Sequence, residues 1–190
     1  MNVISLFSGC GGQSEQKKFV ITYLPNESTD KNADARKGMA GDLSKVLGME
    51  VTELVSNDYN AVIEAMRTGK ADMAYFGPLS FCLAYERAGA EPIGMIAKDK
   101  DKKNATYKSV LVTSSKNTDI NSIQDIKGKT MAFVDPNSTS GNLIPSAAIM
   151  KAFPGEKLSM DDLHINGKFF QAVSFSGKHQ AGLAAVVKGD

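Results

Sequence analysis

The chain has 190 residues, of which 42% are hydrophobic and 23% are charged, a composition typical of globular proteins and not of disordered or fibrous ones. Its 22 Lys and Arg residues against 21 Asp and Glu residues give a net charge of +1, so the composition excludes a broadly basic nucleic-acid surface, and an anion site has to be local. Two cysteines, Cys10 and Cys82, form neither a disulfide framework nor a metal cluster, and no apolar run approaches the roughly 20 residues of a membrane-spanning helix.

The first 17 residues do not resemble a folded element. A short apolar run, Val3 to Phe7, leads into Ser8-Gly9-Cys10, which resembles the end of a bacterial lipoprotein signal. The basic region is missing and the apolar run is shorter than the usual ~7–15 residues. We therefore interpret residues 1–17 as a signal remnant and flexible tether with Cys10 as the lipidation site; the alternative is a disordered tail with an incidental cysteine.

The same stretch, Leu6 to Gly12, also looks like the cofactor-binding loop of cytosine-C5 DNA methyltransferases. That class needs a cysteine nucleophile after a proline, whereas Cys82 follows Phe81. A glycine-rich loop without a preceding strand and a following helix is a weak signal, so this alternative ranks far below the first.

From residue 18 onward, β-rich and helical segments alternate. The best-marked helix carries apolar residues at i, i+3, i+4 and i+7, namely Tyr59, Val62, Ile63 and Met66. Over the first hundred residues we expect strands at 18–24, 51–55, 73–76 and 92–97 and helices at 33–47, 59–68 and 79–88. The alternation predicts a mainly parallel α/β sheet.

The second half repeats this pattern after a charged loop at 98–104. We expect a strand at 107–113 that crosses to a second lobe, then a helical turn at 123–126, strands at 130–134 and 169–175, and helices at 141–153 and 179–188. The helix at 59–68 is followed by Gly-Lys-Ala-Asp and a strand, and the helix at 179–188 is followed by Gly189-Asp190. The same order predicts a further strand after residue 190, and hence a second lobe that is incomplete here.

The segment Asp135 to Leu143 (DPNSTSGNL) links a predicted strand to a predicted helix and is the best candidate for a site. Three hydroxyl residues, Ser138, Thr139 and Ser140, stand where a helix start presents unpaired N–H groups, and these groups together with the helix dipole favour an anion. Hydroxyl donors suit a tetrahedral oxyanion, and Gly141 would let the backbone approach it. Ordinary helix capping is the competing explanation of the same residues.

Several stretches resemble the substrate-binding proteins of phosphonate, phosphite and phosphate ABC transporters. The resemblance extends over nearly all of residues 18–190, and its most specific part is Asp-Pro-Asn-Ser-Thr-Ser-Gly at 135–141. The other matching stretches are residues 57–66, 69–78, 107–111, 175–179 and 184–190.

The resemblance implies a two-lobed, type II-like periplasmic-binding-protein α/β fold, with a first lobe at 18–106 and a crossover strand and incomplete second lobe at 107–190. It also implies site residues: Ser138, Thr139 and Ser140 would donate to phosphonyl oxygens, and other donors would complete the cage. These other residues are the donors Tyr59, Tyr107 and His179 and the cleft-lining Tyr75, Phe76 and Gly77. Taken singly, Tyr59, Tyr107, Tyr75 and Phe76 could be core residues and His179 a helix cap.

The function implied is the extracytoplasmic binding component of an ABC importer, held at the membrane as a lipoprotein. It would capture phosphonate, phosphite or phosphate, dock on a membrane permease, bind no nucleic acid, and need no cofactor, metal or catalytic residue. Family members carry acidic residues beyond position 190 that recognise an amino group on some phosphonates.

Two alternatives stay open. One is an enzyme acting on a phosphorylated small molecule, against which stands the lack of a P-loop lysine, a metal-ligand cluster or an obvious acid paired with His179; Asp135 is the only nearby carboxylate. The other is an importer subunit of the same fold for a different ligand, such as a pyrimidine or a sulfonate.

Overall fold

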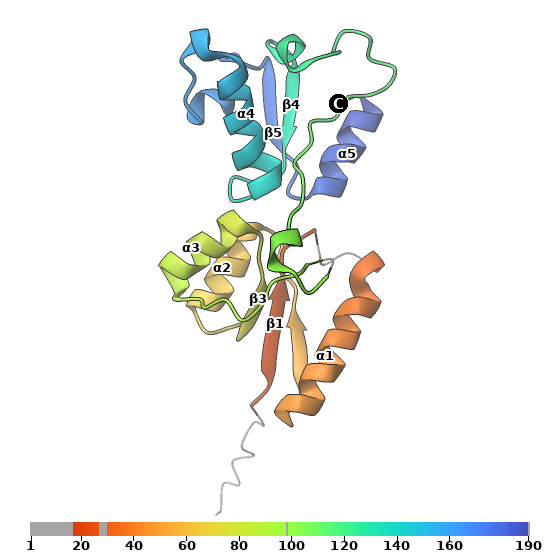
Figure 1. Ribbon diagram of the computed structural model, residues 1–190, viewed down its shortest axis with the longest axis vertical. Coiled ribbons are helices and arrows are strands. Elements are labelled where there is room, and N and C mark those ends of the chain that lie inside the picture. Colours follow the sequence, from red (N-terminus) through yellow and green to blue (C-terminus); the bar gives the residue numbers. More distant parts are fainter. Residues whose placement is uncertain (1–16, 27–29, 98, 190) are drawn as a thin grey trace, which may run out of the picture.

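The computed structural model describes residues 17–26, 30–97 and 99–189. Within them the chain forms two α/β units stacked along the long axis of the molecule (Figure 1). We call residues 19–88 the first lobe and residues 130–188 the second lobe. The segment 105–113 runs from one to the other.

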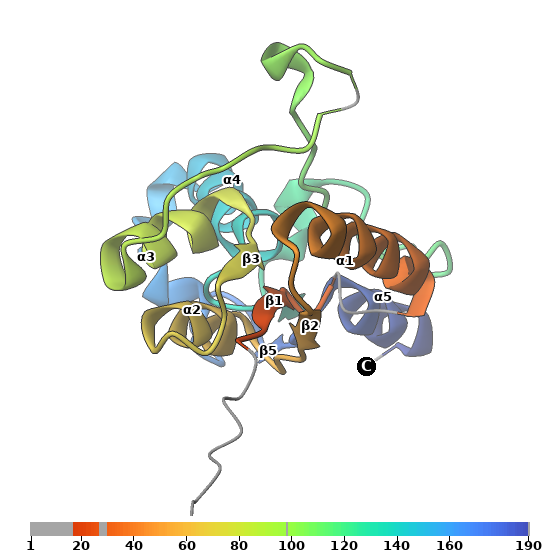
Figure 2. The same cartoon turned by 90° about the horizontal axis from the view of Figure 1, so that it is seen from below.

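The first lobe is built on a parallel sheet of three strands in the order β2-β1-β3, where β1 is Phe19–Tyr23, β2 is Val51–Leu54 and β3 is Met73–Tyr75. Helix α1 (Ala33–Leu47) lies on one side of this sheet, and α2 (Tyr59–Arg67) and α3 (Pro78–Ala88) lie on the other (Figure 2). The apolar face of α2 packs on the sheet and on α3, because its predicted helical spacing brings Val62 and Ile63 to the same side, where both are fully buried.

The second lobe has a parallel pair, β4 (Thr130–Phe133) and β5 (Ala172–Phe175), between α4 (Ile144–Ala152) and α5 (His179–Lys188). Its core is an aromatic and aliphatic cluster that stacks mostly edge to face, as aromatic pairs prefer. The buried members are Phe133, Ile149, Leu163, Phe169 and Phe170.

Most predicted elements are confirmed to within a few residues. Helices at 33–47 and 179–188 have the expected bounds, and residues 123–126 form a 3-10 turn. The strand expected at 169–175 begins only at Ala172, because Phe169 and Phe170 turn into the core.

Two predicted strands are wrong. Residues 92–97 and 107–113 form no strand among the described residues, and many of their apolar side chains are exposed: Ile93, Met95, Ile96, Val110 and Val112. The apolar pattern indicated strands, but a strand also requires a neighbour to accept its backbone hydrogen bonds.

The helix expected from Gly141 also differs, because residues Thr139–Leu143 form a π-helix turn that leads into α4. Turns of π-helix are rare in proteins, and those that occur often lie at functional sites.

Candidate functional site

The turn after β4 carries the three hydroxyl residues and is tied down at both ends. The backbone N–H of Val134 donates to the Gly141 carbonyl, at 3.0 Å. Ser138 caps the π-helix, and its Oγ accepts from the Gly141 N–H, also at 3.0 Å. The turn is therefore closed upon itself, which fixes the directions of Thr139 and Ser140 between these two anchors.

Gly141 stands where no side chain fits. A Cβ at this position would lie 2.3 Å from Val134 Cγ2 and 2.9 Å from Ser138 Oγ. The glycine is required by this close packing of the turn on the end of β4. Its backbone approaches Val134, and Gly141 is buried.

Below the turn, Asn142 is buried and connects three segments. Its Nδ2 donates to the Pro136 carbonyl at 2.9 Å, and its Oδ1 lies 2.7 Å from His164 Nε2. Burial lowers the pKa of His164, so the neutral ring is favoured and Nε2 donates to the amide oxygen.

Tyr59 and Ser138 meet across the two lobes. Tyr59 begins α2 in the first lobe and is only 3% exposed, and its phenol hydrogen-bonds with the Ser138 hydroxyl of the second lobe. Burial raises the pKa of Tyr59, which keeps the phenol protonated. Ser138 is 1% exposed, so it lies beneath the surface of the site.

Thr139 reaches across to the start of α3. Its Oγ1 accepts a 2.8 Å hydrogen bond from the backbone N–H of Leu79. A point at the position of a Cβ on Gly77 would lie 3.5 Å from Thr139 Oγ1 and 3.9 Å from the Tyr107 hydroxyl, so these two hydroxyls flank Gly77. Tyr107 belongs to the connecting segment and remains 58% exposed.

Ser140 and His179 form the third pair. Ser140 Oγ lies 3.4 Å from His179 Nε2 at the start of α5, and the Ser140 carbonyl accepts from Ser109 Oγ at 2.7 Å. The six donors named from the sequence thus gather at one end of each sheet, in contacts that join the two lobes and the connecting segment.

Two of the residues named as cleft-lining differ in their surroundings. Phe76 packs against two hydrophobic clusters, one of which includes Val134 of the second lobe, so it supports the core. Tyr75 ends β3 and is half-buried. Cys10 lies outside the described residues.

Sequence reasoning missed Asn26, which lies just beyond the strand expected at 18–24 and follows β1. Its Oδ1 accepts from the His179 backbone N–H at 2.9 Å, and its Nδ2 donates to the Tyr59 phenol oxygen. A Pro-Asn pair signals a turn, and nothing in it indicates a contact 153 residues away.

Asp135, which the sequence marks as the only carboxylate near the hydroxyl residues, also joins the lobes. Its carboxylate accepts from the backbone N–H of Asn137 at 2.8 Å and from that of Tyr59. Burial raises the pKa of Asp135, and the nearby Asp58 adds to this. The first turns of α2, α3 and α5 each therefore receive a side-chain acceptor from the opposite lobe, which satisfies donors that a helix leaves unpaired.

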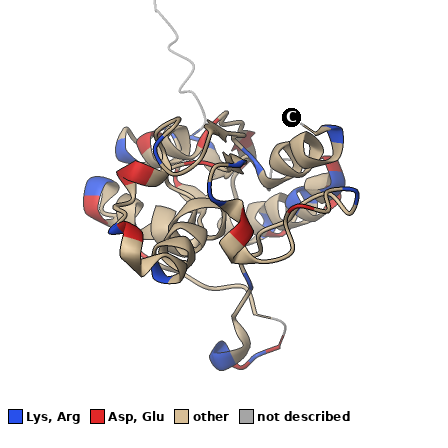
Figure 3. Ribbon diagram, turned by 90° about the horizontal axis from the view of Figure 1, so that it is seen from above, with Lys and Arg blue, Asp and Glu red and all other residues tan. Residues whose placement is uncertain are grey.

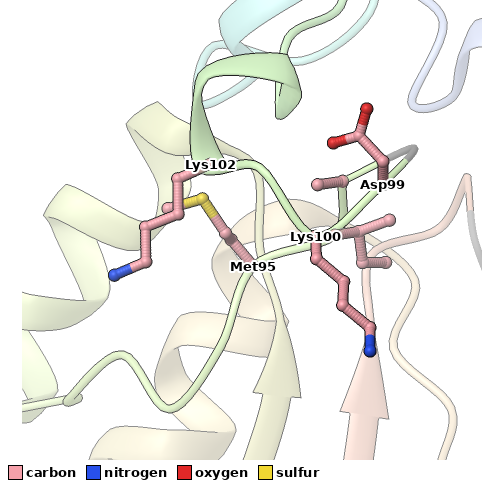
Figure 4. A pocket seen from close by; sticks show the side chains of 6 residues that line it. Met95, Asp99, Lys100 and Lys102 are labelled. Atoms are coloured by element: carbon pink, nitrogen blue, oxygen red, sulfur yellow. The ribbon is translucent and has the colours of Figure 1, made fainter.

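A cavity of about 250 Å³ lies between the lobes, and its lining comes from the segments that follow β1 and β2 and from Ser176, Gly177 and Lys178 before α5, so none of the six donors lines it. A larger hollow of about 460 Å³ lies on the loop at 95–102, away from the hydroxyl residues. Figure 4 shows the ammonium groups of Lys100 and Lys102 and the carboxylate of Asp99 pointing in different directions there. The loop hollow therefore lacks the converging polar groups of a ligand site.

Charges are mixed over the surface, with Lys and Arg interspersed among Asp and Glu (Figure 3). No helix in the described part of the chain is long and apolar enough to cross a membrane. Within the same residues, no group of three or more His, Cys, Asp or Glu side chains could hold a metal ion.

Residues 21–190 match the family model described as ABC transporter, phosphonate, periplasmic substrate-binding protein. The chain is 29% identical to the phosphate-import protein PhnD of Mycolicibacterium smegmatis, over 99% of its own length and 60% of that protein. It is 31% identical to the phosphonates-binding periplasmic protein of Escherichia coli (74% and 42%) and to a probable phosphite-binding protein, PhnD1, of Prochlorococcus marinus (93% and 57%). The chain thus spans about half the length of these relatives.

Solved structures show the same fold. A binding-protein component of an ABC phosphonate transporter from Pseudomonas aeruginosa matches with a TM-score of 0.73 and 24% identity, over 92% of this chain and 55% of that one. PhnD1 from Prochlorococcus marinus in complex with methylphosphonate matches with a TM-score of 0.60 and 24% identity, over 91% and 61%.

Proposed function

Because the chain belongs to the family of periplasmic substrate-binding proteins of phosphonate ABC transporters, we propose that it captures a phosphonate, phosphite or phosphate anion for import. One observation carries the proposal: the three hydroxyls of the turn each lie beside a further donor, Ser138 beside Tyr59 of the first lobe, Thr139 beside Tyr107 of the connecting segment, and Ser140 beside His179 of α5. The names of the similar proteins differ in ligand but share a phosphorus oxyanion.

The hydrogen-bond directions leave protons for such an anion. Thr139 Oγ1 already accepts from the Leu79 N–H, so its own proton remains to be donated. The hydrogen bond between the Tyr59 and Ser138 hydroxyls uses the proton of one of them, and the proton of the other remains to be donated to the anion. The unprotonated oxygens of such an anion accept hydrogen bonds, so these donors suit them.

Donors of this kind account for useful affinity. Each hydrogen bond to a charged group contributes about 1.5–3 kcal/mol, and three or four of them reach the ~8 kcal/mol of a micromolar complex. The π-helix turn and α4 follow one another, and the positive end of their helix dipole lies at the hydroxyl residues, where it attracts an anion.

In this proposal the two lobes close on the anion, and the closed form docks on a membrane permease. No bond is made or broken, since the role of the site is to bind and release. The location is extracytoplasmic, with a lipid on Cys10 as the anchor; labelling of the expressed chain with a radioactive fatty acid, lost in a Cys10→Ala variant, tests the anchor separately.

Isothermal titration calorimetry of the 190-residue chain tests the capture role. Phosphate, phosphite, methylphosphonate and 2-aminoethylphosphonate are titrated, with sulfate as a second tetrahedral oxyanion. We expect saturable binding of at least one phosphorus anion, lost in a Thr139→Val/Ser140→Ala variant and kept in the exposed Thr118→Val control. A folded chain that binds none of the phosphorus anions, or binds sulfate equally well, contradicts the proposal.

A further inference from the structure

Asn26 is one of the residues through which the two sides of the proposed site contact each other. It follows β1 in the first lobe, and its side-chain amide forms two hydrogen bonds: Nδ2 donates to the phenol oxygen of Tyr59, and Oδ1 accepts from the backbone N–H of His179 at 2.9 Å. Its backbone carbonyl also accepts from Gln180 Nε2 at 3.4 Å. One short side chain thus connects α2 of the first lobe with α5 of the second.

Both partners of this amide are proposed anion donors. Because the phenol oxygen of Tyr59 accepts from Asn26, its own proton points away from the amide, either to Ser138 or to a bound oxygen. Because Oδ1 holds the first N–H of α5, it fixes the turn that carries the His179 ring toward Ser140.

We propose that Asn26 is a positioning residue of the anion site: it sets the hydrogen-bond direction of Tyr59 and the placement of His179 together. This inference rests on the proposed anion-binding function. An amide is the group that meets both requirements, since it donates at one end and accepts at the other without a charge. A carboxylate in its place would still accept from His179, but could not donate to Tyr59, and it would place a negative charge beside the anion.

A purely structural role for Asn26, holding the lobes together, makes a different prediction. In that case a carboxylate that keeps the contact with His179 would bind the anion nearly as well as the amide does. A positioning role makes the carboxylate worse than alanine at neutral pH, and makes the loss depend on its protonation.

The test measures the dissociation constant for methylphosphonate by calorimetry from pH 5 to 8, in the 190-residue chain and its Asn26→Asp, Asn26→Ala and Asn60→Asp variants. Asn60 is the second residue of α2, is exposed, and accepts a hydrogen bond from Arg87. Asn60→Asp therefore adds the same charge near Tyr59 and leaves the hydrogen bonds of Asn26 in place. Thermal unfolding of each variant is recorded in parallel.

We expect Asn26→Ala to weaken binding at least tenfold and Asn26→Asp at least thirtyfold at pH 8. Relative to the unmodified chain, the loss in Asn26→Asp shrinks as the pH falls and the carboxyl gains a proton that it can donate to Tyr59. Asn60→Asp stays within threefold. Binding by Asn26→Asp within threefold of the unmodified chain, or a loss independent of pH, overturns the role of Asn26 alone. A folded, unmodified chain that binds no phosphorus anion overturns the proposed function, and this inference with it.

Discussion

The hydroxyl of Thr139 accepts a 2.8 Å hydrogen bond from the backbone N–H of Leu79, although the two residues are 60 positions apart and lie in opposite lobes. The contact caps α3 with a side chain from the other lobe. Asp135 does the same for α2, and Asn26 does so for α5. Contact between the lobes therefore satisfies helix N–H groups that separation of the lobes would leave to water.

Replacing Thr139 tests this contact. Thr139→Val keeps the shape but removes the acceptor for Leu79 and the proton offered to the anion. We expect the free energy of unfolding to fall by about 0.5–1.5 kcal/mol, as for a typical hydrogen bond. Methylphosphonate affinity should fall at least tenfold, measured by calorimetry. Thr139→Ser keeps the hydroxyl and should restore both; if it does not, the hydroxyl is not what acts.

Gly141→Ala should destabilise the turn, because the new Cβ would lie 2.3 Å from Val134 Cγ2. Such overpacking costs about 1–3 kcal/mol, which urea denaturation measures. Gly155→Ala is the matched control, since a Cβ there meets nothing within 4 Å. Equal effects of the two substitutions would show that the close packing at Gly141 is not needed.

Asp135→Asn should remove the pH dependence of stability that Asp135 causes. Burial holds the pKa of Asp135 above its usual 3.8, so the folded chain binds this proton more tightly than the unfolded chain does. That contribution is complete below pH 3.8 and is lost as the pH rises through the raised pKa, which leaves a buried charge at neutral pH. The melting-temperature gap between Asp135→Asn and the unmodified chain should thus shift in favour of Asp135→Asn as the pH rises from 4 to 7. A gap that does not change with pH would contradict this assignment.

His164 should make stability fall in mild acid. Burial lowers the pKa of His164 below 6.5, so the unfolded chain takes up a proton first. Its contribution is present above pH 6.5 and is lost as the pH falls through the lowered pKa. In urea denaturation between pH 7.5 and 5, the unmodified chain should lose stability, and His164→Gln, which can still donate to Asn142, should lose less. Parallel pH profiles would mean that another group is responsible.

The parts of the fold that depend on local sequence could be predicted. The apolar spacing of Tyr59, Val62 and Ile63 predicts a helix without any knowledge of the rest of the fold. The hydroxyl residues followed by Gly141 predict a helix start in the same way. The π-helix could not be predicted, because it depends on how closely Gly141 packs on Val134.

Features that depend on the relation between distant segments were missed or wrong. The strands expected at 92–97 and 107–113 have suitable apolar residues but no pairing strand among the described residues. The roles of Asn26 and Asp135 arise only when the carboxyl ends of the two sheets face each other, since their partners lie in the opposite lobe.

The most direct test of the central claim is a crystal structure of the 190-residue chain grown with methylphosphonate. The account predicts a phosphonyl group between the lobes, with its oxygens within hydrogen-bond distance of Thr139 Oγ1, of Ser140 Oγ and of the Tyr59 or Tyr107 hydroxyl. A phosphonyl group bound elsewhere, such as the hollow beside Lys100 and Lys102, or a site left without the anion under saturating methylphosphonate, would contradict it.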